Sequence, residues 1–127
     1  MMAEMSTSPF LAGAAATSNV VEYVQVWFPS PRLTPEFRKS IEDDFARFST
    51  IFERESDGDE GLAVGWSVDD EDHPEVQGEK ARCFFVMRGW ASMERFGRST
   101  QTEAAKEAFP IVFGWLAPFK LVSFQVL

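Results

Sequence analysis

The sequence predicts an α+β domain in which an antiparallel sheet carries two helices on one face. Four short segments rich in β-branched and aromatic residues are bounded on at least one side by glycines, prolines or acidic residues, which is typical of strands. Two other segments start with a capping residue and repeat apolar residues at helical spacing. Their order along the chain is β-α-β-β-α-β, which is the order of the ferredoxin-like split unit.

The first strand and helix are predicted in residues 20–52. Residues 20–28, "VVEYVQVWF", are apolar on both faces of the expected strand, so both faces should be covered. The prolines of "PSPRLT" end the strand. Thr34 is the expected N-cap of a helix, with Pro35 and Glu36 in its first turn. Phenylalanines at helical spacing extend this helix to Phe52.

The second half predicts a hairpin, a helical region and a last strand. Strands are expected at residues 61–68 and 81–90, joined by a long charged loop over residues 69–80. Ser92 should cap the next helix, with Glu94 in its first turn and a break near Gly97. A second helical piece covers "TEAAKEAF", Pro110 starts a last short turn through Trp115, and residues 119–127 form the final strand.

Composition limits the class of function. The 127 residues predict one domain over residues 20–127, preceded by a disordered tail over residues 1–19. A net charge of −8 argues against nucleic-acid binding and against anionic membrane surfaces. No apolar run approaches the length of a membrane span. The single cysteine, Cys83, favours a reducing compartment, so a cytoplasmic location is expected.

The open face of the sheet predicts a partner. Helices in this topology cover one face only, yet the strand at residues 20–28 is apolar on both. A second copy of the chain is the simplest cover. We therefore predict a homodimer packed sheet to sheet, with Tyr23, Gln25 and Trp27 turned toward the partner.

The motif "RGWASMERF" at residues 88–96, together with this order of elements, resembles the dimeric α+β barrel superfamily. That superfamily includes antibiotic-biosynthesis-monooxygenase-like proteins, stress-responsive A/B barrel proteins and olivetolic acid cyclase-like enzymes. The resemblance covers about residues 20–127. It implies an enzyme that works without metal or organic cofactor and binds hydrophobic intermediates between sheet and helices.

The chain departs from the plant cyclase-like members at their acid–base residues. Those members use two histidines and a tyrosine. Aligned on "WAS", the corresponding positions are Glu22, Ala105 and the neighbourhood of Ser99. Their particular cyclisation machinery is therefore absent.

Glu22 and Arg88 are the predicted catalytic pair. If they face each other across neighbouring strands, both point toward the helices among apolar residues. Burial would raise the pKa of Glu22 and an adjacent arginine would lower it. The pair could orient substrate and transfer protons, or it could be an ion pair at a strand end with no catalytic role.

His73, the only histidine, is the third catalytic candidate. It could shuttle protons or lie on a lid, but four preceding acids and Pro74 also fit a solvated loop. No set of residues predicts a metal site. The expected substrate-binding residues are mostly apolar: Val24, Phe45, Trp66, Phe84, Val86, Phe96, Ser99 and Trp115.

These features favour a cofactor-independent enzyme of specialised metabolism. It would bind a polyketide- or terpenoid-like intermediate and promote its cyclisation or isomerisation. The cyclisation could be a pericyclic ring closure, and part of the effect would come from folding the substrate into a reactive shape. Two alternatives stay open. One is a non-catalytic stress-response or small-molecule-binding dimer, and the other is a cofactor-free monooxygenase.

Overall fold

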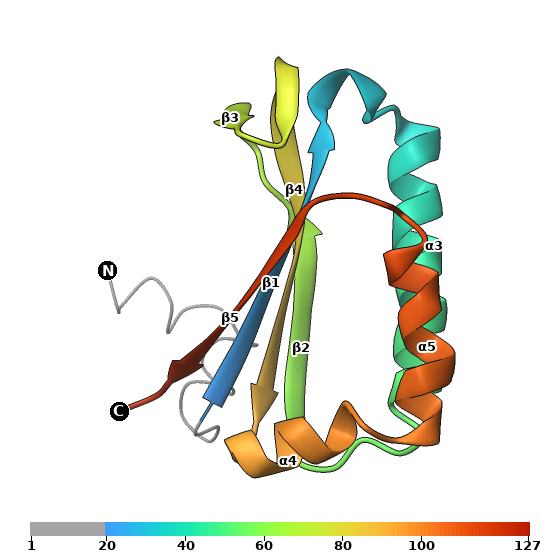
Figure 1. The fold of residues 1–127 in the computed structure, drawn as a ribbon, viewed down its shortest axis with the longest axis vertical. Helices are drawn as coiled ribbons and strands as arrows, with labels where there is room; N and C mark the ends of the chain where they lie inside the picture. The colour runs from blue at the N-terminus through green and yellow to red at the C-terminus, as the bar shows by residue number, and fades with distance from the viewer. Residues whose placement is uncertain (1–19) are drawn as a thin grey trace.

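A computed structural model describes residues 20–127 of the chain, and the predicted tail at residues 1–19 lies outside the described residues. Two layers make up the fold, a twisted antiparallel sheet and a layer of helices on one of its faces (Figure 1). The strands are β1 (Val20–Pro29), β2 (Asp59–Trp66), β3 (Glu71–His73), β4 (Val76–Trp90) and β5 (Phe119–Gln125). The helices are the short 3-10 turn η1 (Ser30–Arg32), α3 (Pro35–Phe52), α4 (Met93–Ser99) and α5 (Glu103–Phe113).

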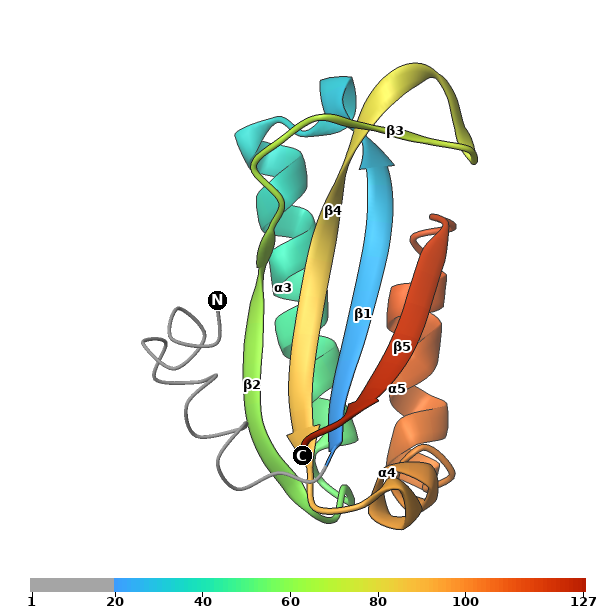
Figure 2. The same ribbon diagram turned by 90° about the vertical axis from the view of Figure 1, so that its left-hand side faces the viewer.

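The strand order is β2-β4-β1-β5, and β3 pairs with the N-terminal half of β4 (Figure 2). β1 therefore lies between β4 and β5 and is antiparallel to both, as in the ferredoxin-like unit. Register places Glu22 directly opposite Arg88, and Val24 opposite Val86. The alternation of a strand then turns Glu22, Val24 and Val26 toward the helices.

Both predicted N-caps are present. The Thr34 hydroxyl accepts a hydrogen bond from the Phe37 N–H at 3.1 Å, and the Ser92 hydroxyl accepts one from the Arg95 N–H at 3.1 Å. The apolar face of α3 buries Ile41, Phe45 and Phe52 against the sheet. Pro110 differs from expectation, because it lies inside a continuous α5 instead of starting a separate turn.

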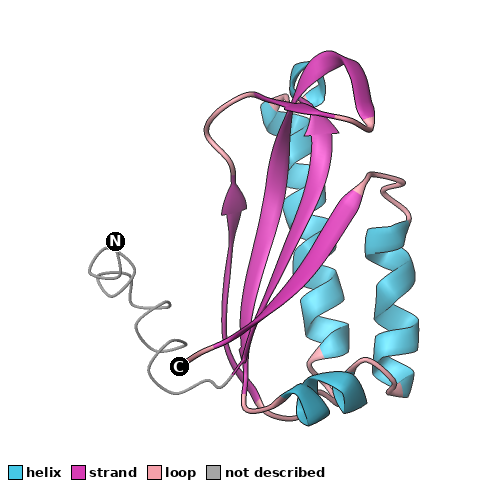
Figure 3. Cartoon of the chain, turned by 60° about the vertical axis from the view of Figure 1, so that its left-hand side comes forward, coloured by secondary structure: helices cyan, strands magenta, loops and turns pink. Residues whose placement is uncertain are grey.

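The loop predicted at residues 69–80 is largely a strand pair. β3 pairs with β4 through Glu71↔Ala81 and His73↔Val76 (Figure 3). The acidic run at residues 69–72 suggested a solvated loop, but two of its four carboxylates form ion pairs across the ladder. Arg82 contacts Asp70 at 2.7 Å and Lys80 contacts Asp72 at 2.9 Å. Exposed pairs of this kind add little stability, but they offset part of the repulsion among the neighbouring acids.

This hairpin changes the expected partner face. Trp27 lies on the outer face of the sheet with Tyr23 and Gln25, yet it is only 8% exposed. It packs in a small cluster with Val76, Ala81 and Cys83, and the His73 ring lies 5.0 Å from its own. The prediction that Trp27 faces a partner is therefore wrong, because the chain covers this residue itself. Tyr23 and Gln25 are part-exposed.

Candidate functional site

A cavity of about 270 Å³ lies between the sheet and the helices. Side chains from β1, β4 and β5 form one wall. Side chains from α3, α4 and α5, and from the segments that follow α4 and α5, form the other. The lining residues are Glu22, Val24, Val26, Phe45, Phe48, Phe52, Phe84, Val86, Arg88, Phe96, Thr100, Phe109, Val112, Phe113, Trp115, Ala117, Phe119 and Leu121. All but Glu22, Arg88 and Thr100 are apolar or aromatic, so the cavity suits a hydrophobic molecule with few polar groups.

The rim of the cavity lies along β5 and the end of α5. Phe113, Phe119 and Leu121 line the cavity and are also 45–57% exposed. β5 is an edge strand that pairs only with β1 among the described residues. The way into the cavity therefore passes beside an apolar edge.

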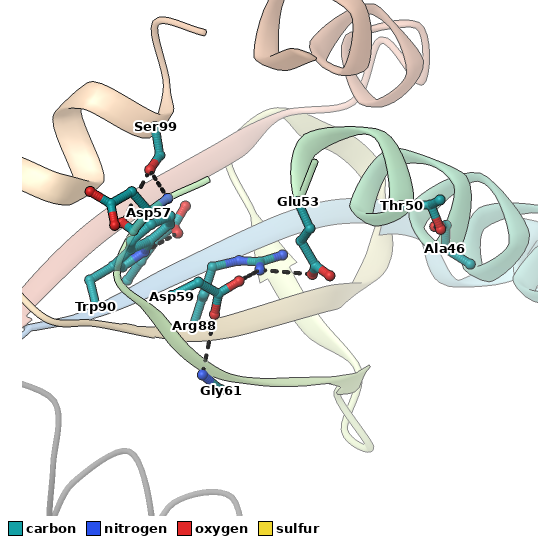
Figure 4. A network of polar contacts seen from close by, with 10 residues as sticks. Ala46, Thr50, Glu53, Asp57, Asp59, Gly61, Arg88, Trp90 and Ser99 are labelled. Carbon is teal, nitrogen blue, oxygen red and sulfur yellow. Dashed lines mark hydrogen bonds and ion pairs between the residues drawn. The ribbon is translucent and has the colours of Figure 1, made fainter. Parts of the chain in front are cut away.

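Arg88 is held by two carboxylates at the buried end of β4. Its side chain is 3% exposed, and its Nη1 donates to Asp59 Oδ2 and, at 3.0 Å, to Glu53 Oε2. Figure 4 shows Arg88 between these two carboxylates, one from the start of β2 and one from the residue after α3. The guanidinium also lies 5.4 Å from the ring of Phe52. These contacts fix the direction of the arginine side chain.

The placement of Asp59 depends on an irregularity in β2. The register shifts between Asp59 and Leu62, and Gly61 adopts a positive φ of 137°, which a residue with a side chain rarely adopts. The Asp59 Oδ1 accepts a hydrogen bond from the Gly61 N–H at 3.2 Å, which leaves Oδ2 for Arg88. The bulge thus aims the aspartate at the arginine.

Glu22 is paired differently. Its Oε1 accepts a hydrogen bond from Trp90 Nε1 at 3.0 Å, and Trp90 is fully buried. Burial raises the pKa of the Glu22 carboxyl, and this effect outweighs the lowering by Trp90 and by the charge of Arg88, while Asp59 raises the pKa further. The sequence left open whether burial or the neighbouring arginine has the larger effect on the pKa of Glu22. Burial has the larger effect, because Arg88 makes its ion pairs with Asp59 and Glu53.

This raised pKa predicts a pH-dependent stability. A carboxyl with a higher pKa in the folded state stabilises the fold at low pH, and the contribution is lost as pH rises from the unfolded value through the folded one. Glu22→Gln keeps the shape without the charge, so we expect its melting temperature to exceed that of the wild type more at about pH 8 than at about pH 4. Thermal melts at the two pH values measure this difference. An equal difference at both would show that Glu22 titrates as an exposed glutamate does.

Most of the predicted site residues come together. Glu22, Arg88, Val24, Phe45, Phe84, Val86, Phe96 and Trp115 all line the cavity. Three predicted residues lie elsewhere. Trp66 packs against Phe84 and donates its Nε1–H to Glu42 at 2.8 Å. Ser99 accepts a hydrogen bond from the Asp57 N–H at 2.9 Å and so anchors the segment before β2.

His73 lies on the outer face of the sheet, away from the cavity lining. Its Nδ1 accepts a hydrogen bond from the Glu75 N–H at 3.1 Å. The structure therefore separates this candidate from Glu22 and Arg88.

The residues predicted for the site did not include Phe48 and Phe52, which line the cavity, or Asp59 and Glu53, which pair with Arg88. The phenylalanine spacing on the first helix contained the signal for Phe48 and Phe52. Asp59 and Glu53 gave no such signal, because both belong to a generally acidic stretch. No group of three or more His, Cys, Asp or Glu side chains suited to a metal ion occurs within residues 20–127. None of the helices in the same range is long and apolar enough to cross a membrane.

Comparison with solved structures supports the fold. No protein family and no curated protein matches the sequence. SnoaB from Streptomyces nogalater, a cofactor-independent oxygenase, is similar with a TM-score of 0.57 and 14% identity over 87% of this chain and 95% of that one. A dimeric ferredoxin-like protein of unknown function from Thermobifida fusca gives 0.53 and 15% over 84% and 90%.

A putative antibiotic biosynthesis monooxygenase from Bacillus cereus is also similar, with a TM-score of 0.52 and 15% identity over 84% of this chain and 91% of that one. At such identities the likeness concerns the fold. The fold prediction is confirmed: the chain has the ferredoxin-like α+β fold that these solved structures share.

Proposed function

We propose that the chain is a cofactor-independent enzyme of specialised metabolism. It binds a hydrophobic polyketide- or terpenoid-like intermediate in the cavity and promotes its cyclisation or isomerisation. The observation that carries the proposal is the Glu22 carboxyl, which lines an apolar cavity beside a buried arginine and has a raised pKa. A carboxyl with a raised pKa is a stronger base than an ordinary glutamate once it is ionised, which suits it to proton transfer with a bound substrate.

In the proposed reaction the Glu22 carboxylate removes a proton from a carbon next to a substrate carbonyl. The electrons of the C–H bond move to the carbonyl oxygen, and Arg88 stabilises the enolate that forms. In a substrate with a C=C bond next to the enolate, Glu22 returns the proton to the far carbon of that bond, which shifts the double bond and completes an isomerisation. Alternatively, the enolate carbon attacks a second carbonyl of the substrate, a C–C bond closes the ring, and the alkoxide that forms takes the proton from Glu22. The apolar walls hold the substrate in a folded conformation, which also favours a pericyclic closure.

The first experiment identifies the ligand and tests the proton transfer separately. Mass spectrometry of small molecules co-purified with the protein should find an apolar, oxygen-containing compound. In D₂O, the protein should accelerate deuterium exchange at the carbon next to the carbonyl of a bicyclic ketone such as 2-tetralone, followed by NMR. An exchange rate equal to that in buffer alone at every pH would refute the proton transfer by Glu22.

A cofactor-free monooxygenase is the second candidate. It is supported by the similarity of the fold to SnoaB, a cofactor-independent oxygenase. An oxygenase would consume dissolved O₂ with the co-purified substrate, and a cyclase or isomerase would not. An oxygen electrode therefore distinguishes the two.

A homodimer packed through the outer sheet face is part of the proposal. The rings of Tyr23, Phe85 and Phe124 gather there, with the Tyr23 ring 6.4 Å from each of the others. Phe124 is 50% exposed on this face of the single chain. An apolar patch left uncovered in this way is typical of an interface.

The dimer predicts a change of mass on substitution. Wild-type protein should scatter X-rays as two chains, whereas Phe124→Lys should shift the population toward single chains. Val68→Lys is the control, because Val68 is an exposed apolar residue outside the ring cluster. A wild type with the mass of one chain would contradict the proposed dimer.

A further inference from the structure

Trp90 holds the side chain of Glu22 through its indole N–H. Alternation along the paired strands turns Glu22, Arg88 and Trp90 to the helix side of the sheet, and the register sets Trp90 diagonally across from Glu22. Trp90 Nε1 donates to Glu22 Oε1 at 3.0 Å. Arg88 directs its Nη1 to Asp59 and Glu53 instead. Within the described part of the chain, Trp90 is therefore the one hydrogen-bond donor to the Glu22 side chain.

The indole of Trp90 lies outside the reach of a ligand in the cavity. Trp90 has no exposed surface, and it is not among the residues that line the cavity. The Phe52 ring stands edge-on to the indole at 6.2 Å, and the Phe96 ring lies 5.4 Å from it. Both phenylalanines line the cavity, so the indole packs against residues of the wall without being part of it. Trp90 can therefore act on a ligand only through Glu22.

This pairing gives the two carboxylate oxygens of Glu22 different roles. Oε1 is held by Trp90, whereas Oε2 accepts no hydrogen bond from residues 20–127. In contrast to Nη2 of Arg88, Oε2 is not completely enclosed by protein atoms. Because Glu22 lines the cavity, Oε2 is the oxygen that remains for a ligand.

Two other tryptophans form the same kind of pair away from the proposed reacting groups. Trp66 Nε1 donates to Glu42 at 2.8 Å, and Trp115 Nε1 donates to Asp44 at 3.0 Å. Neither of these acids lines the cavity. Of the three pairs, the one made by Trp90 fixes the acid that a ligand in the cavity can meet.

From this arrangement we infer that Trp90 is a positioning residue of the site: its N–H fixes Oε1 of Glu22 and so directs Oε2 at the C–H bond from which Glu22 takes a proton. The inference rests on the proposed role of Glu22 as the base. The proton moves to Oε2 and the electron pair of the C–H bond moves to the carbonyl oxygen of the substrate, while the indole keeps its own proton. A glutamate side chain has several rotatable bonds, and the hydrogen bond removes that freedom before the ligand arrives.

Wild-type protein tests the hold of Trp90 on Glu22 without any catalysis. In ¹H–¹⁵N NMR spectra, the indole N–H of Trp90 should shift with pH at the same midpoint as the ¹³C signal of the Glu22 carboxyl, because a hydrogen bond to a carboxylate is stronger than one to a neutral acid. This shift should disappear in Glu22→Gln. A Trp90 indole signal that stays constant while Glu22 titrates would overturn the inference.

Trp90→Phe tests the consequence for proton transfer, because it keeps an aromatic ring and removes the N–H. With 2-tetralone in D₂O, kcat for exchange at high pH should fall about tenfold or more, as expected for a misplaced base. KM should change less than about twofold, since the indole does not line the cavity. The acid limb of the rate should move to higher pH, because the hydrogen bond from Trp90 lowers the pKa of Glu22. Arg88 and Asp59, the charged groups that also act on this pKa, are unchanged in the variant.

Trp66→Phe is the matched control, because it removes the same N–H group from a carboxylate outside the cavity. It should leave kcat and the acid limb at their wild-type values. If Trp90 tuned only the basicity of Glu22, the rate at high pH would stay the same or rise in Trp90→Phe, since a higher pKa makes a stronger base. If Trp90 served folding alone, the acid limb would not move. Either result would overturn the inference.

The two measurements also separate this inference from the proposed function. Should Trp90→Phe fail to fold, the NMR titration of the wild type decides. A wild type with coupled titration of Trp90 and Glu22 but no accelerated exchange would refute the proposed function and support the hold of Trp90 on the carboxyl. Exchange that depends on Glu22 but is the same with and without the Trp90 N–H would do the reverse.

Discussion

Glu22→Gln is expected to lower the rate of proton exchange in bound 2-tetralone by about 10²-fold or more, which is the usual contribution of a positioned general base. The amide can still accept the hydrogen bond from Trp90 Nε1, so the local packing is kept. It cannot accept a proton from carbon. The measurement is the initial rate of deuterium incorporation by NMR at saturating ketone.

Glu42→Gln is the matched control for this result. Glu42 is another glutamate of the same domain that accepts a hydrogen bond from a tryptophan, Trp66, but it does not line the cavity. The Glu42→Gln variant should catalyse exchange at the same rate as the wild type. The wild-type rate should rise with pH through a pKa above the usual range for glutamate, since the carboxylate is the active form. Retained exchange in Glu22→Gln would remove Glu22 from the mechanism.

Asp59→Asn is expected to lower the pKa of Glu22. Asp59 holds Arg88 through Nη1, and its own charge raises the pKa of Glu22. Without that charge, the positive charge of Arg88 is less compensated and favours the ionised form of the glutamate opposite it. The acid limb of the exchange rate should therefore move to lower pH, and a ¹³C NMR titration of the Glu22 carboxyl should follow it.

The same substitution should destabilise the fold by about 2 kcal/mol, as expected when a charged hydrogen-bond partner of a buried group is lost. Asp43→Asn is the control, because Asp43 pairs with Lys39 on the exposed surface of α3 and should cost less than about 0.5 kcal/mol. Urea unfolding of both variants gives the comparison. An unmoved Glu22 titration would show that Asp59 serves stability alone.

The order of the elements and the starts of the helices could be predicted from the sequence because their signals are local, whereas the continuity of α5 through Pro110 was not predicted. Thr34 and Ser92 are capping residues followed by acids, and the phenylalanine spacing defines one face of α3. The expectation that Glu22 and Arg88 face each other rested on the ferredoxin-like topology and on the alignment to the resembling family, and the strand register bears it out.

The remaining features depend on contacts between distant segments. The acids before His73 fit a loop until Lys80 and Arg82 are placed across the ladder from Asp72 and Asp70. The role of Asp59 depends on a bulge that only the pairing with β4 defines. For the same reason, the sequence alone could not tell whether the pKa of Glu22 is raised or lowered, because that depends on which carboxylates Arg88 contacts.

Because β5 lies at the edge of the sheet, the entrance of the cavity and the proposed catalytic pair belong to different strands. Glu22 and Arg88 belong to β1 and β4, whose ladder runs through the middle of the sheet, whereas Phe119 and Leu121 at the rim belong to a strand bonded on one side only. Edge strands open at lower free energy than central ones. Outward bending of this strand would thus admit a bulky ligand and release it again, while Glu22 and Arg88, the proposed reacting groups, stay in register.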